Sequence, residues 1–362
     1  MRFPISCSRA LISAAVAALC GLPVMVAEAA SGIALTPMKL SGEFLGKKKK
    51  DVATDLSGIA CLAAKGASRT CLAVNDENRN AQFLTIEENR MTVGEPVTLI
   101  GDDPDKKTLG KPPKKLDCTA GEGKYGDLDG EGVTFSAPYF YVVGSHGCSR
   151  HANEFRLGSF ILSQIRVDDS GQPVKDAVQN TYRVSDILKQ AGKAAKSFGK
   201  DLTTAHGLNI EGIAADGDRL WFGLRAPLQK DSAFLVAASI KDLFEAGHDR
   251  SKAKPIPPVR IALGGLGIRD LAVLADKRLL VLAGATEGPE VAFRVFIADP
   301  ADGSTRELGT LPAVTGSVDN AQVTGKAEGI TVLDMDADRI RAVVLFDALP
   351  NGAPHIAMIP LK

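Results

Sequence analysis

The sequence is poor in aromatic residues and has no excess of charge of either sign. Phe, Tyr and Trp make up 5% of the 362 residues, and there is a single Trp. Lys plus Arg and Asp plus Glu number 43 each, so the formal net charge is zero. A neutral chain has no overall field to attract nucleic acid or an anionic membrane surface. We therefore expect neither as a partner.

Several catalytic signatures are also missing. The chain has no Gly-x-Ser-x-Gly nucleophile elbow, no His-Glu-x-x-His zinc motif, no phosphate-binding glycine-rich loop and no Cys-x-x-Cys pair. Nucleophilic ester cleavage of the familiar kind, zinc proteolysis and nucleotide chemistry thus have no support. The sequence leaves open whether the protein is an enzyme.

Long apolar runs are absent except at the N-terminus. Basic residues precede an Ala-rich apolar segment at residues 10–26, and a small-x-small sequence follows at residues 27–29. This arrangement is typical of a cleaved export signal, and the apolar segment is too short for a good membrane span. We expect residues 1–30 to be removed. Residues 31–362 are then predicted to form one monomeric domain, periplasmic or secreted, without a membrane span.

Four cysteines remain in the mature chain: Cys61, Cys71, Cys118 and Cys148. An even number in an oxidising compartment indicates two disulfides, among three possible pairings. Cys61 and Cys71 lie on consecutive predicted strands that a disulfide would join. Cys118 and Cys148 flank the second repeat described below and form the remaining pair. The alternative is four separate buried thiols.

What the chain has in quantity is glycine, with 36 residues, and a repeated phrase. The clearest copy, at residues 209–225, is Glu-Gly, a short apolar strand, an Asp-Gly turn and a second apolar strand that ends on a charged residue. Weaker copies begin near residues 56, 130, 268 and 327. A strand-turn-strand unit repeated every 60 to 80 residues or so is the signature of propeller blades. We predict an all-β fold, a five-bladed β-propeller. Six blades are the alternative, and a two-sheet sandwich ranks third.

Two details of the predicted propeller concern its second and last blades. A helix capped by Ser185 is expected at residues 186–200, as an insertion in the second repeat. The last repeat contains only three predicted strands. A strand expected at residues 38–45 would supply the missing outer strand from the N-terminus and close the ring.

Polar residues recur at two points of the repeat that meet at one mouth of a propeller axis. These points are the start of each inner strand and the end of the strand that follows it. The glycine beside the first point allows inner strands to approach closely near the axis. The predicted pocket residues are Asp76, Glu131, Ser145, His146, Glu211, Arg225, Arg269, Glu328 and Asp347.

This set of charges has two interpretations. In the first, the mouth is a ligand or cation site, and oxygen donors favour calcium, with Glu131, Glu211 and Glu328 as its ligands. In the second, Arg225 and Arg269 neutralise the glutamates in an internal ring of salt bridges that holds the blades together. No cofactor other than calcium is indicated.

The segment at residues 209–227 resembles the hallmark of an uncharacterised bacterial family, domain of unknown function 3616. Asp76-Glu77, Glu131-Gly132 and the sequence Val-Gly-Ser-His at residues 143–146 resemble the family's other marks, so the likeness spans about residues 50–360. That family is more distantly similar to exported propellers with phytase-like or esterase-like labels. Some phytase-type propellers bind calcium and hydrolyse phosphate esters. This sequence lacks their cluster of lysines and acids around a phosphate pocket. The resemblance therefore implies the propeller fold and a polar site at one mouth of its axis.

Two functions follow as hypotheses. The first is a binding or scaffold protein of the cell envelope, which takes a small-molecule or protein ligand in the polar pocket. The alternative is a calcium-assisted, phytase-like hydrolase of phosphate or carboxylate esters. In that case Glu131, Glu211 and Glu328 would be ligands or the general base, and Arg225 would hold an anion.

Overall fold

The computed structural model describes Met1 and residues 32–47, 51–101, 106–114, 116–118, 120–150, 152–287 and 291–362, with the side chains of residues 120–124 excepted. The chain divides into the units Met1–Ala30 and Ser31–Lys362. The expected export signal lies, apart from Met1, outside the described residues and stays a prediction. None of the helices in the described ranges combines the length and the apolarity that crossing a bilayer requires.

Five sheets, each of four or five strands, form the blades of the unit Ser31–Lys362. From the axis outward, blade 1 contains β3 (Leu56–Cys61), β4 (Ser68–Asn75), β5 (Asn80–Glu87), β6 (Arg90–Thr98) and β2 (Lys39–Ser41). Blade 2 contains β8 (Gly130–Ser136), β9 (Tyr139–Gly144), β11 (Leu162–Val167) and β12 (Pro173–Thr181). Blade 3 contains β13 (Asn209–Asp216), β14 (Arg219–Ala226), β15 (Ser232–Ser239) and β16 (Val259–Ala262).

The last two blades follow the same order. Blade 4 contains β17 (Gly267–Val273), β18 (Leu279–Gly284), β19 (Arg294–Ala298) and β20 (Thr305–Thr310). Blade 5 contains β23 (Lys326–Met335), β24 (Arg339–Asp347), β25 (His355–Pro360) and β1 (Ala34–Pro37). Outside the blades, β7 (Ala120–Lys124) pairs with β10 (Glu154–Arg156), and β21 (Thr315–Val318) pairs with β22 (Ala321–Thr324).

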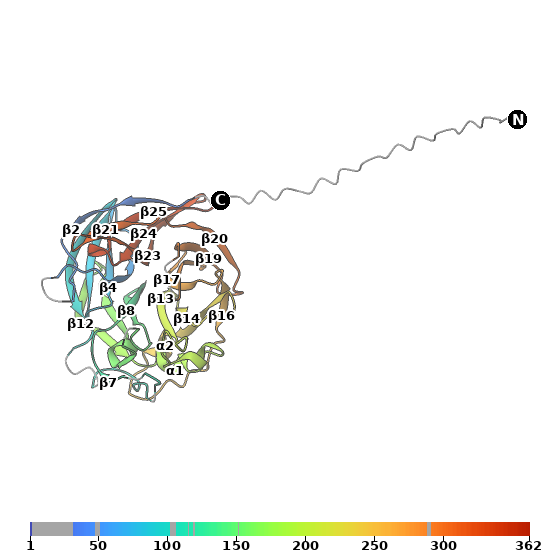
Figure 1. Cartoon of the computed structure of the whole chain (residues 1–362). Coiled ribbons are helices and arrows are strands. Elements are labelled where there is room, and N and C mark those ends of the chain that lie inside the picture. Colours follow the sequence, from blue (N-terminus) through green and yellow to red (C-terminus); the bar gives the residue numbers. More distant parts are fainter. Residues whose placement is uncertain are drawn as a thin grey trace. The chain divides into compact units, whose positions relative to one another are not determined.

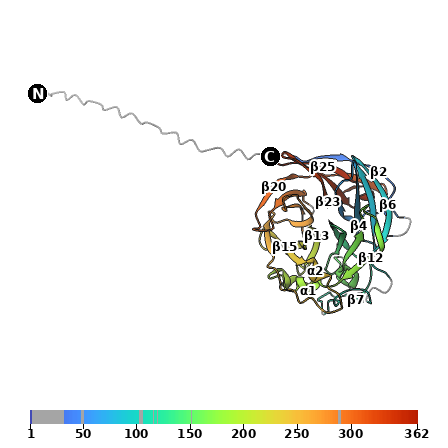
Figure 2. The same cartoon turned by 180° about the vertical axis from the view of Figure 1, so that it is seen from behind.

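The inner strands form a closed ring. β3 contacts β8, β8 contacts β13, β13 contacts β17, β17 contacts β23, and β23 returns to β3. Figure 1 shows β8, β13, β17 and β23 toward the centre, with β12, β16 and β20 outside, and Figure 2 shows the same ring from behind. The prediction of five blades is confirmed, and the six-bladed and sandwich alternatives are wrong.

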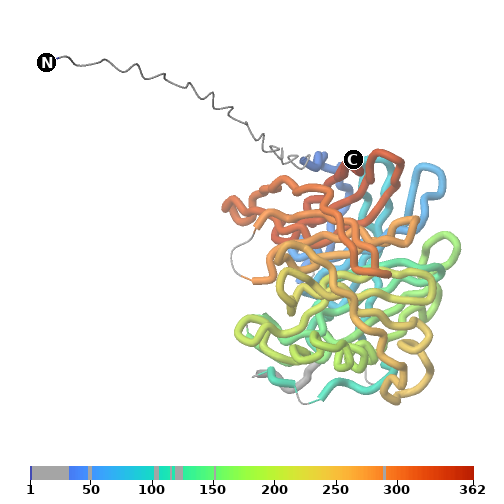
Figure 3. Tube along the Cα trace, turned by 90° about the vertical axis from the view of Figure 1, so that its right-hand side faces the viewer, coloured from blue at the N-terminus to red at the C-terminus, as the bar shows by residue number. Residues whose placement is uncertain are grey.

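The N-terminal segment closes the ring, as predicted, but through a different strand. β1 pairs antiparallel with β25, with Leu35 opposite Ala357. The ladder ends at Pro37, which has no N–H to donate. Residues 38–45 supply β2 instead, which runs parallel to β6 at the edge of blade 1. The blue start of the described fold therefore lies beside the red C-terminal strand (Figure 3).

The helical insertion exists, but it is not the single long helix predicted. α1 (Val184–Leu188) has Arg183 at its N-cap, and Ser185 lies inside the helix. A 3₁₀ turn follows at Ala194–Ser197. The helix cannot continue between them because Gly192 adopts a φ of 54°, in the left-handed region. A second short helix, α2 (Ile240–Leu243), follows β15 in blade 3.

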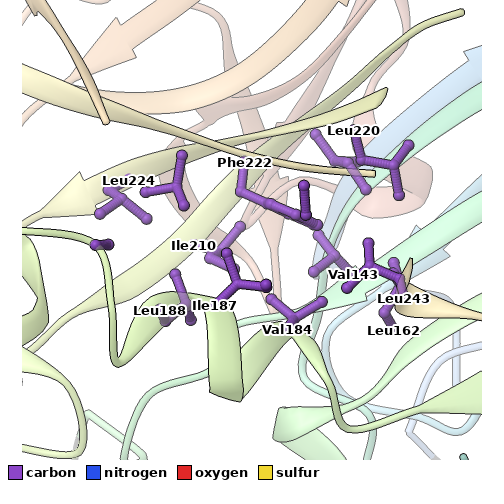
Figure 4. Close-up of a cluster of buried hydrophobic side chains, with 14 of the residues drawn as sticks. Val143, Leu162, Val184, Ile187, Leu188, Ile210, Leu220, Phe222, Leu224 and Leu243 are labelled. Carbon is purple, nitrogen blue, oxygen red and sulfur yellow. The ribbon is translucent and has the colours of Figure 1, made fainter. Parts of the chain in front are cut away.

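The hydrophobic core is divided into five clusters, one between each pair of neighbouring blades. Alternate residues of one strand serve two clusters: Val142 packs toward blade 1, and Val143 packs toward blade 3. Figure 4 shows the cluster between blades 2 and 3, where Ile187 and Leu188 of α1 pack beside Phe222. The apolar spacing that predicted the helix therefore comes from packing against these blades.

Both predicted disulfides are confirmed. Cys61 and Cys71 stand opposite each other on β3 and β4. Cys118 is bonded to Cys148, in the loop after β9. The alternative of four separate thiols is wrong.

The glycines of the repeated phrase bring the inner strands into close contact at the axis. A Cβ on Gly58 would lie 2.8 Å from Gly132 Cα, and a Cβ on Gly132 would lie 3.0 Å from the Glu211 carbonyl oxygen. Only a residue without a side chain allows such an approach. Because these contacts join neighbouring blades, they form a tight belt around the axis.

Blade 4 has Asp270 at the position of the glycine. Its carboxylate accepts hydrogen bonds from the backbone N–H of Leu271, at 2.8 Å, and from that of Ile330 in blade 5, at 2.7 Å. The side chain thus ties two inner strands together within the belt. A small cavity of about 90 Å³, lined by the inner strands beyond the belt, marks one end of the axis. The predicted mouth lies at the other end.

Candidate functional site

Each inner strand carries a β-bulge at the same point of the repeated phrase. In β13 the pairing register shifts between Ile210 and Gly212, so Glu211 has no partner in β14. The other four inner strands show the same shift. A bulge bends its strand and re-aims a side chain, often beside a functional site. The bulged residues, from blade 1 to blade 5, are Ser57, Glu131, Glu211, Arg269 and Glu328.

A cavity of about 360 Å³, here called the mouth cavity, opens at this end of the axis. Its lining is strongly polar, and no aromatic side chain of the described residues takes part. Eight carboxyl groups line it: Asp76, Glu77, Asp127, Asp129, Glu131, Glu211, Glu328 and Asp347. Five cationic side chains also line it: Lys47, Arg150, Arg156, Arg225 and Lys326.

Most of the side chains predicted for the pocket line this cavity. They are Asp76, Glu131, Ser145, Glu211, Arg225, Glu328 and Asp347. Arg269 does not line it but lies beneath, with its side chain fully buried and bonded to two lining glutamates. His146 is not part of the lining. Its backbone φ of 54° and its edge-on packing on Phe160, with ring centroids 5.8 Å apart, place it in the core. Burial lowers the pKa of His146 to about 4, so the ring is neutral.

Glu211 is the most strongly held carboxylate of the site. Its Oε1 accepts hydrogen bonds from Arg225 Nη1 at 2.8 Å and from Asn209 Nδ2 at 3.0 Å, and its Oε2 accepts one from Arg269 Nη1 at 2.8 Å. Burial opposes ionisation, but Arg225 and Arg269 outweigh it and lower the pKa of Glu211 to about 2. Glu211 is therefore ionised throughout the physiological range.

Glu328 shares Arg269 with Glu211 but has the opposite protonation state at neutral pH. Its Oε1 accepts a hydrogen bond from Arg269 Nη1 at 2.8 Å. Burial, and then the charge of Asp347, raise the pKa of Glu328 to about 8. Asp347 itself pairs with Lys326 Nζ at 3.0 Å. One arginine thus separates a carboxylate from a carboxylic acid.

Glu131 and Asp76 have no such partners. Neither side chain forms a hydrogen bond or an ion pair with the described residues, and Asp76 Oδ1 is fully buried. Burial raises the pKa of Glu131 well above its ordinary value, and the charge of Glu211 raises it further. Burial and then Asp129 raise the pKa of Asp76 in the same way. Both carboxyls therefore bind a proton more readily than an exposed carboxyl does, and a nearby cation would favour their ionised forms.

The geometry bears on both interpretations of the charged mouth. Arg225 and Arg269 do neutralise Glu211, as the salt-bridge interpretation expects, but they leave Glu131 unpaired. Arg269 Nη1 stands between Glu211 and Glu328, the point where calcium would have to bind both. Across the described ranges, no group of three or more His, Cys, Asp or Glu side chains is placed to hold a metal ion. Calcium stays an untested prediction.

Several polar residues of the site were missed by the sequence analysis. Arg150 comes from the loop after β9, outside the repeated phrase. Other missed residues could have been found from the sequence, because the residue two places before each bulge is polar in four of the five blades. From blade 1 to blade 5 these residues are Asp55, Asp129, Asn209, Gly267 and Lys326. A repeat extended by two residues would have added Asp129, Asn209 and Lys326 to the pocket.

Comparison with known proteins gives one family match and weak similarity to solved structures. No curated protein matches the chain. Among solved structures it is similar to the α-L-arabinofuranosidase PaAbf62A from Podospora anserina, at 14% identity and a TM-score of 0.42, covering 90% of this chain and 96% of that one. It is also similar to the exo-β-1,3-galactanase 1,3Gal43A from Clostridium thermocellum, at 10% identity and a TM-score of 0.45, covering 91% and 63%. Such weak likeness carries no activity over to this chain.

The family match lies in the C-terminal half. Residues 174–353 match the model of the family described as "Protein of unknown function (DUF3616)". This range contains the segment at residues 209–227 that carried the resemblance, together with the bulges of blades 3, 4 and 5. The resemblance predicted from the sequence is confirmed, since residues 174–353 are similar to this family of unknown function.

Proposed function

We propose that the mouth cavity is a binding site for a small hydrophilic ligand and that the protein acts by binding it. The observation that carries this proposal is the bulge repeated in all five blades, which directs Glu131, Glu211 and Glu328 to one cavity of about 360 Å³. That volume lies within the range of small-molecule sites. The lining has almost no apolar side chain, so the ligand it suits is hydrophilic.

A purely structural ring of ion pairs explains the site less well. Such a ring would satisfy its carboxylates and would need no cavity, whereas Glu131 lines the cavity without a hydrogen bond or ion pair from the described residues. Leaving a poorly solvated polar group without a partner costs about 1–3 kcal/mol. A bound ligand would supply the missing partner.

The test is a binding screen with a matched control. The purified protein is examined by thermal shift against amino acids, amines, sugars, sugar phosphates and organic acids, and hits are measured by calorimetry. Saturation at one hundred times Kd adds about 2.7 kcal/mol, which raises the melting temperature by a few degrees. The Glu131→Gln variant should lose the shift. Glu95→Gln, an exposed residue of β6, should keep it. A screen without any hit, or hits that Glu131→Gln leaves unchanged, would overturn the proposal.

A second candidate function is hydrolysis, and one observation favours it. Glu328 holds a proton near neutral pH, while Glu211 beside it is ionised. Two carboxyls with widely separated pKa values are the usual arrangement of an acid–base pair. Glu211 already accepts three hydrogen bonds, so its role would be to position Arg225, whose cation would stabilise the negative charge that develops on the ester as water attacks. Glu328 would donate a proton to the leaving oxygen, and the proton of the attacking water would pass to solvent.

Hydrolysis is tested with chromogenic phosphate and carboxylate esters, each with added calcium and with a chelator. Turnover that Glu328→Gln removes, while folding is retained, would support the enzyme. Dependence on calcium would support the calcium-assisted form. Inactivity on the whole panel would leave binding as the function.

Export to the periplasm or the cell surface is part of the same proposal. The two disulfides fit an extracellular location. Mass spectrometry of the protein recovered from its native host should find a new N-terminus near residue 30. A chain that keeps residues 1–30, or is found with reduced cysteines, would contradict export.

A further inference from the structure

The cationic side chains of the mouth cavity all have acidic partners already. Arg225 lies 2.8 Å from Glu211, and Lys326 lies 3.0 Å from Asp347. The others pair less deeply: Lys47 with Glu77 at 3.0 Å, Arg156 with Glu154 at 2.9 Å, and Arg150 with Glu211 at 3.9 Å. None of these cations forms an ion pair with Asp76 or Glu131 in the described part of the chain, although the charge of Glu131 attracts Arg150 from a greater distance.

Four lining carboxyls remain without an ion-pair partner in the described part of the chain: Asp76, Asp127, Asp129 and Glu131. Ser145 Oγ donates a hydrogen bond to Asp129. Asp76 and Glu131 receive no hydrogen bond from any described residue, although Asp76 Oδ1 is fully buried. Two acceptors in one cavity therefore lack donors, and the surrounding side chains do not supply them.

The unpartnered carboxyls lie on one side of the site. Asp76 follows β4 of blade 1, and Glu131 is the bulged residue of blade 2, whereas Arg225 and Arg269 come from blades 3 and 4. Lys47, Arg150 and Arg156 also line the cavity from segments next to blades 1 and 2, but their ion pairs are with Glu77, Glu211 and Glu154 and not with Asp76 or Glu131. The backbones that carry the two side chains are adjacent, since a Cβ on Gly130, next to Glu131, would lie 3.5 Å from the carbonyl oxygen of Asn75, next to Asp76.

We propose that the ligand of this site carries a primary ammonium group, which binds between Asp76 and Glu131. This inference rests on the proposed binding function and names its ligand class. An ammonium group has three N–H donors and no acceptor, so it can satisfy both carboxyls at once. Hydrogen bonds between ionised partners are roughly twice as strong as neutral ones. An organic cation also suits the site better than a metal ion, because no described group of three acidic side chains is placed to ligate one.

Binding of such a ligand should release protons. Burial raises the pKa of both Asp76 and Glu131 in the free protein, and an ammonium group between them would lower both by favouring the ionised forms. Affinity should therefore rise as the pH is raised from 6 to 8. A neutral ligand of the same shape would show neither effect.

The experiment uses putrescine and its neutral counterpart 1,4-butanediol as probes, with succinate as an anionic probe. Calorimetry in two buffers of different ionisation enthalpy gives the number of protons released. We expect putrescine to bind at pH 7.5 with proton release, and butanediol and succinate to bind at least tenfold more weakly. Asp76→Asn and Glu131→Gln should each weaken putrescine binding at least tenfold, with Glu95→Gln as the matched control on β6. Both variants should fold, because neither side chain bonds to the described residues.

The outcomes separate this inference from the function on which it rests. If a sugar or an acid binds in a manner that depends on Glu131 while amines are inert, the binding site stands and its ligand class is wrong. If putrescine binds without proton release, or Asp76→Asn does not weaken it, the ammonium position is wrong. If no compound of the wider screen binds, both proposals fail together.

Discussion

Glu211 and Glu328 should respond in opposite ways to the same substitution by glutamine. They occupy equivalent bulges in blades 3 and 5, and both bond to Arg269. At pH 7 Glu328, with a pKa of about 8, is mostly protonated, so Glu328→Gln exchanges one neutral group for another of the same size. The raised pKa means that wild-type Glu328 already destabilises the folded state at pH 7, a penalty that glutamine does not carry, so we expect Glu328→Gln to be neutral or stabilising. Glu211→Gln leaves the buried charges of Arg225 and Arg269 without their main partner and should cost about 3–5 kcal/mol.

The pKa shifts of Glu211 and Glu328 predict how the free energy of unfolding depends on pH. The pKa of Glu211 falls from 4.5 to about 2, so its contribution to stability is present above pH 4.5 and is lost as the pH falls toward 2. That shift corresponds to about 3 kcal/mol. The pKa of Glu328 rises from 4.5 to about 8, so its contribution is complete below pH 4.5 and is lost as the pH rises through 8. The upper limit of that loss is about 5 kcal/mol.

The assay is urea unfolding at pH 5, 7 and 9, followed by the fluorescence of the single tryptophan. Trp221 lies buried in the cluster between blades 3 and 4 and reports on loss of the core. The wild type should lose more stability than Glu328→Gln between pH 7 and 9. Glu95→Gln should follow the wild type at every pH. If both variants at the site lose the same free energy at pH 7, or if Glu328→Gln is the more sensitive to alkali, the assigned protonation states are wrong.

Three further predictions concern the inner strands and the disulfide that support the site. Gly58→Ala places a Cβ 2.8 Å from a backbone carbon of the next inner strand and should cost about 3 kcal/mol or more in urea unfolding, whereas Gly101→Ala, which meets nothing within 4 Å, should be neutral. Asp270→Ala removes the acceptor of the Ile330 N–H and should cost about 2–4 kcal/mol; equal stability would show that the bond between blades 4 and 5 contributes nothing. Cys118→Ser opens a disulfide with a sequence separation of 30, should cost about 4 kcal/mol, and should weaken ligand binding because its partner lines the mouth cavity. Unchanged affinity would show that the loop carrying Cys148 takes no part in ligand binding.

The repeat made the fold predictable, because each copy forms a blade from local strands and turns. The disulfide pairing followed from it, since Cys61 and Cys71 fall on adjacent strands. The closing strand was misplaced because two edges compete for the N-terminal segment, and the sequence does not show which edge residues 34–37 reach. The helix at residues 186–200 was overestimated because its apolar spacing continued past Gly192, whose left-handed backbone breaks it.

The site was predictable as a set of positions but not as a set of interactions. The repeat brought Glu131, Glu211 and Glu328 to one end of the axis, because equivalent residues of blades converge there. It did not show that Arg269 is shared by two glutamates, nor that Glu131 has no partner, because both depend on distances of a few ångströms. His146 was misassigned because a turn with positive φ directs its ring into the core.

The belt of close backbone contacts at the axis limits how the mouth cavity exchanges its contents. The mouth cavity and the small cavity at the opposite end share no lining residue, and the glycine contacts lie between them. The close backbone contacts of the belt therefore lie across the axis between the two cavities. We expect a ligand of the mouth cavity to leave by the way it entered, past the half-exposed Lys47–Glu77 pair, so substitutions of that pair should change its dissociation rate more than substitutions at the opposite end of the axis.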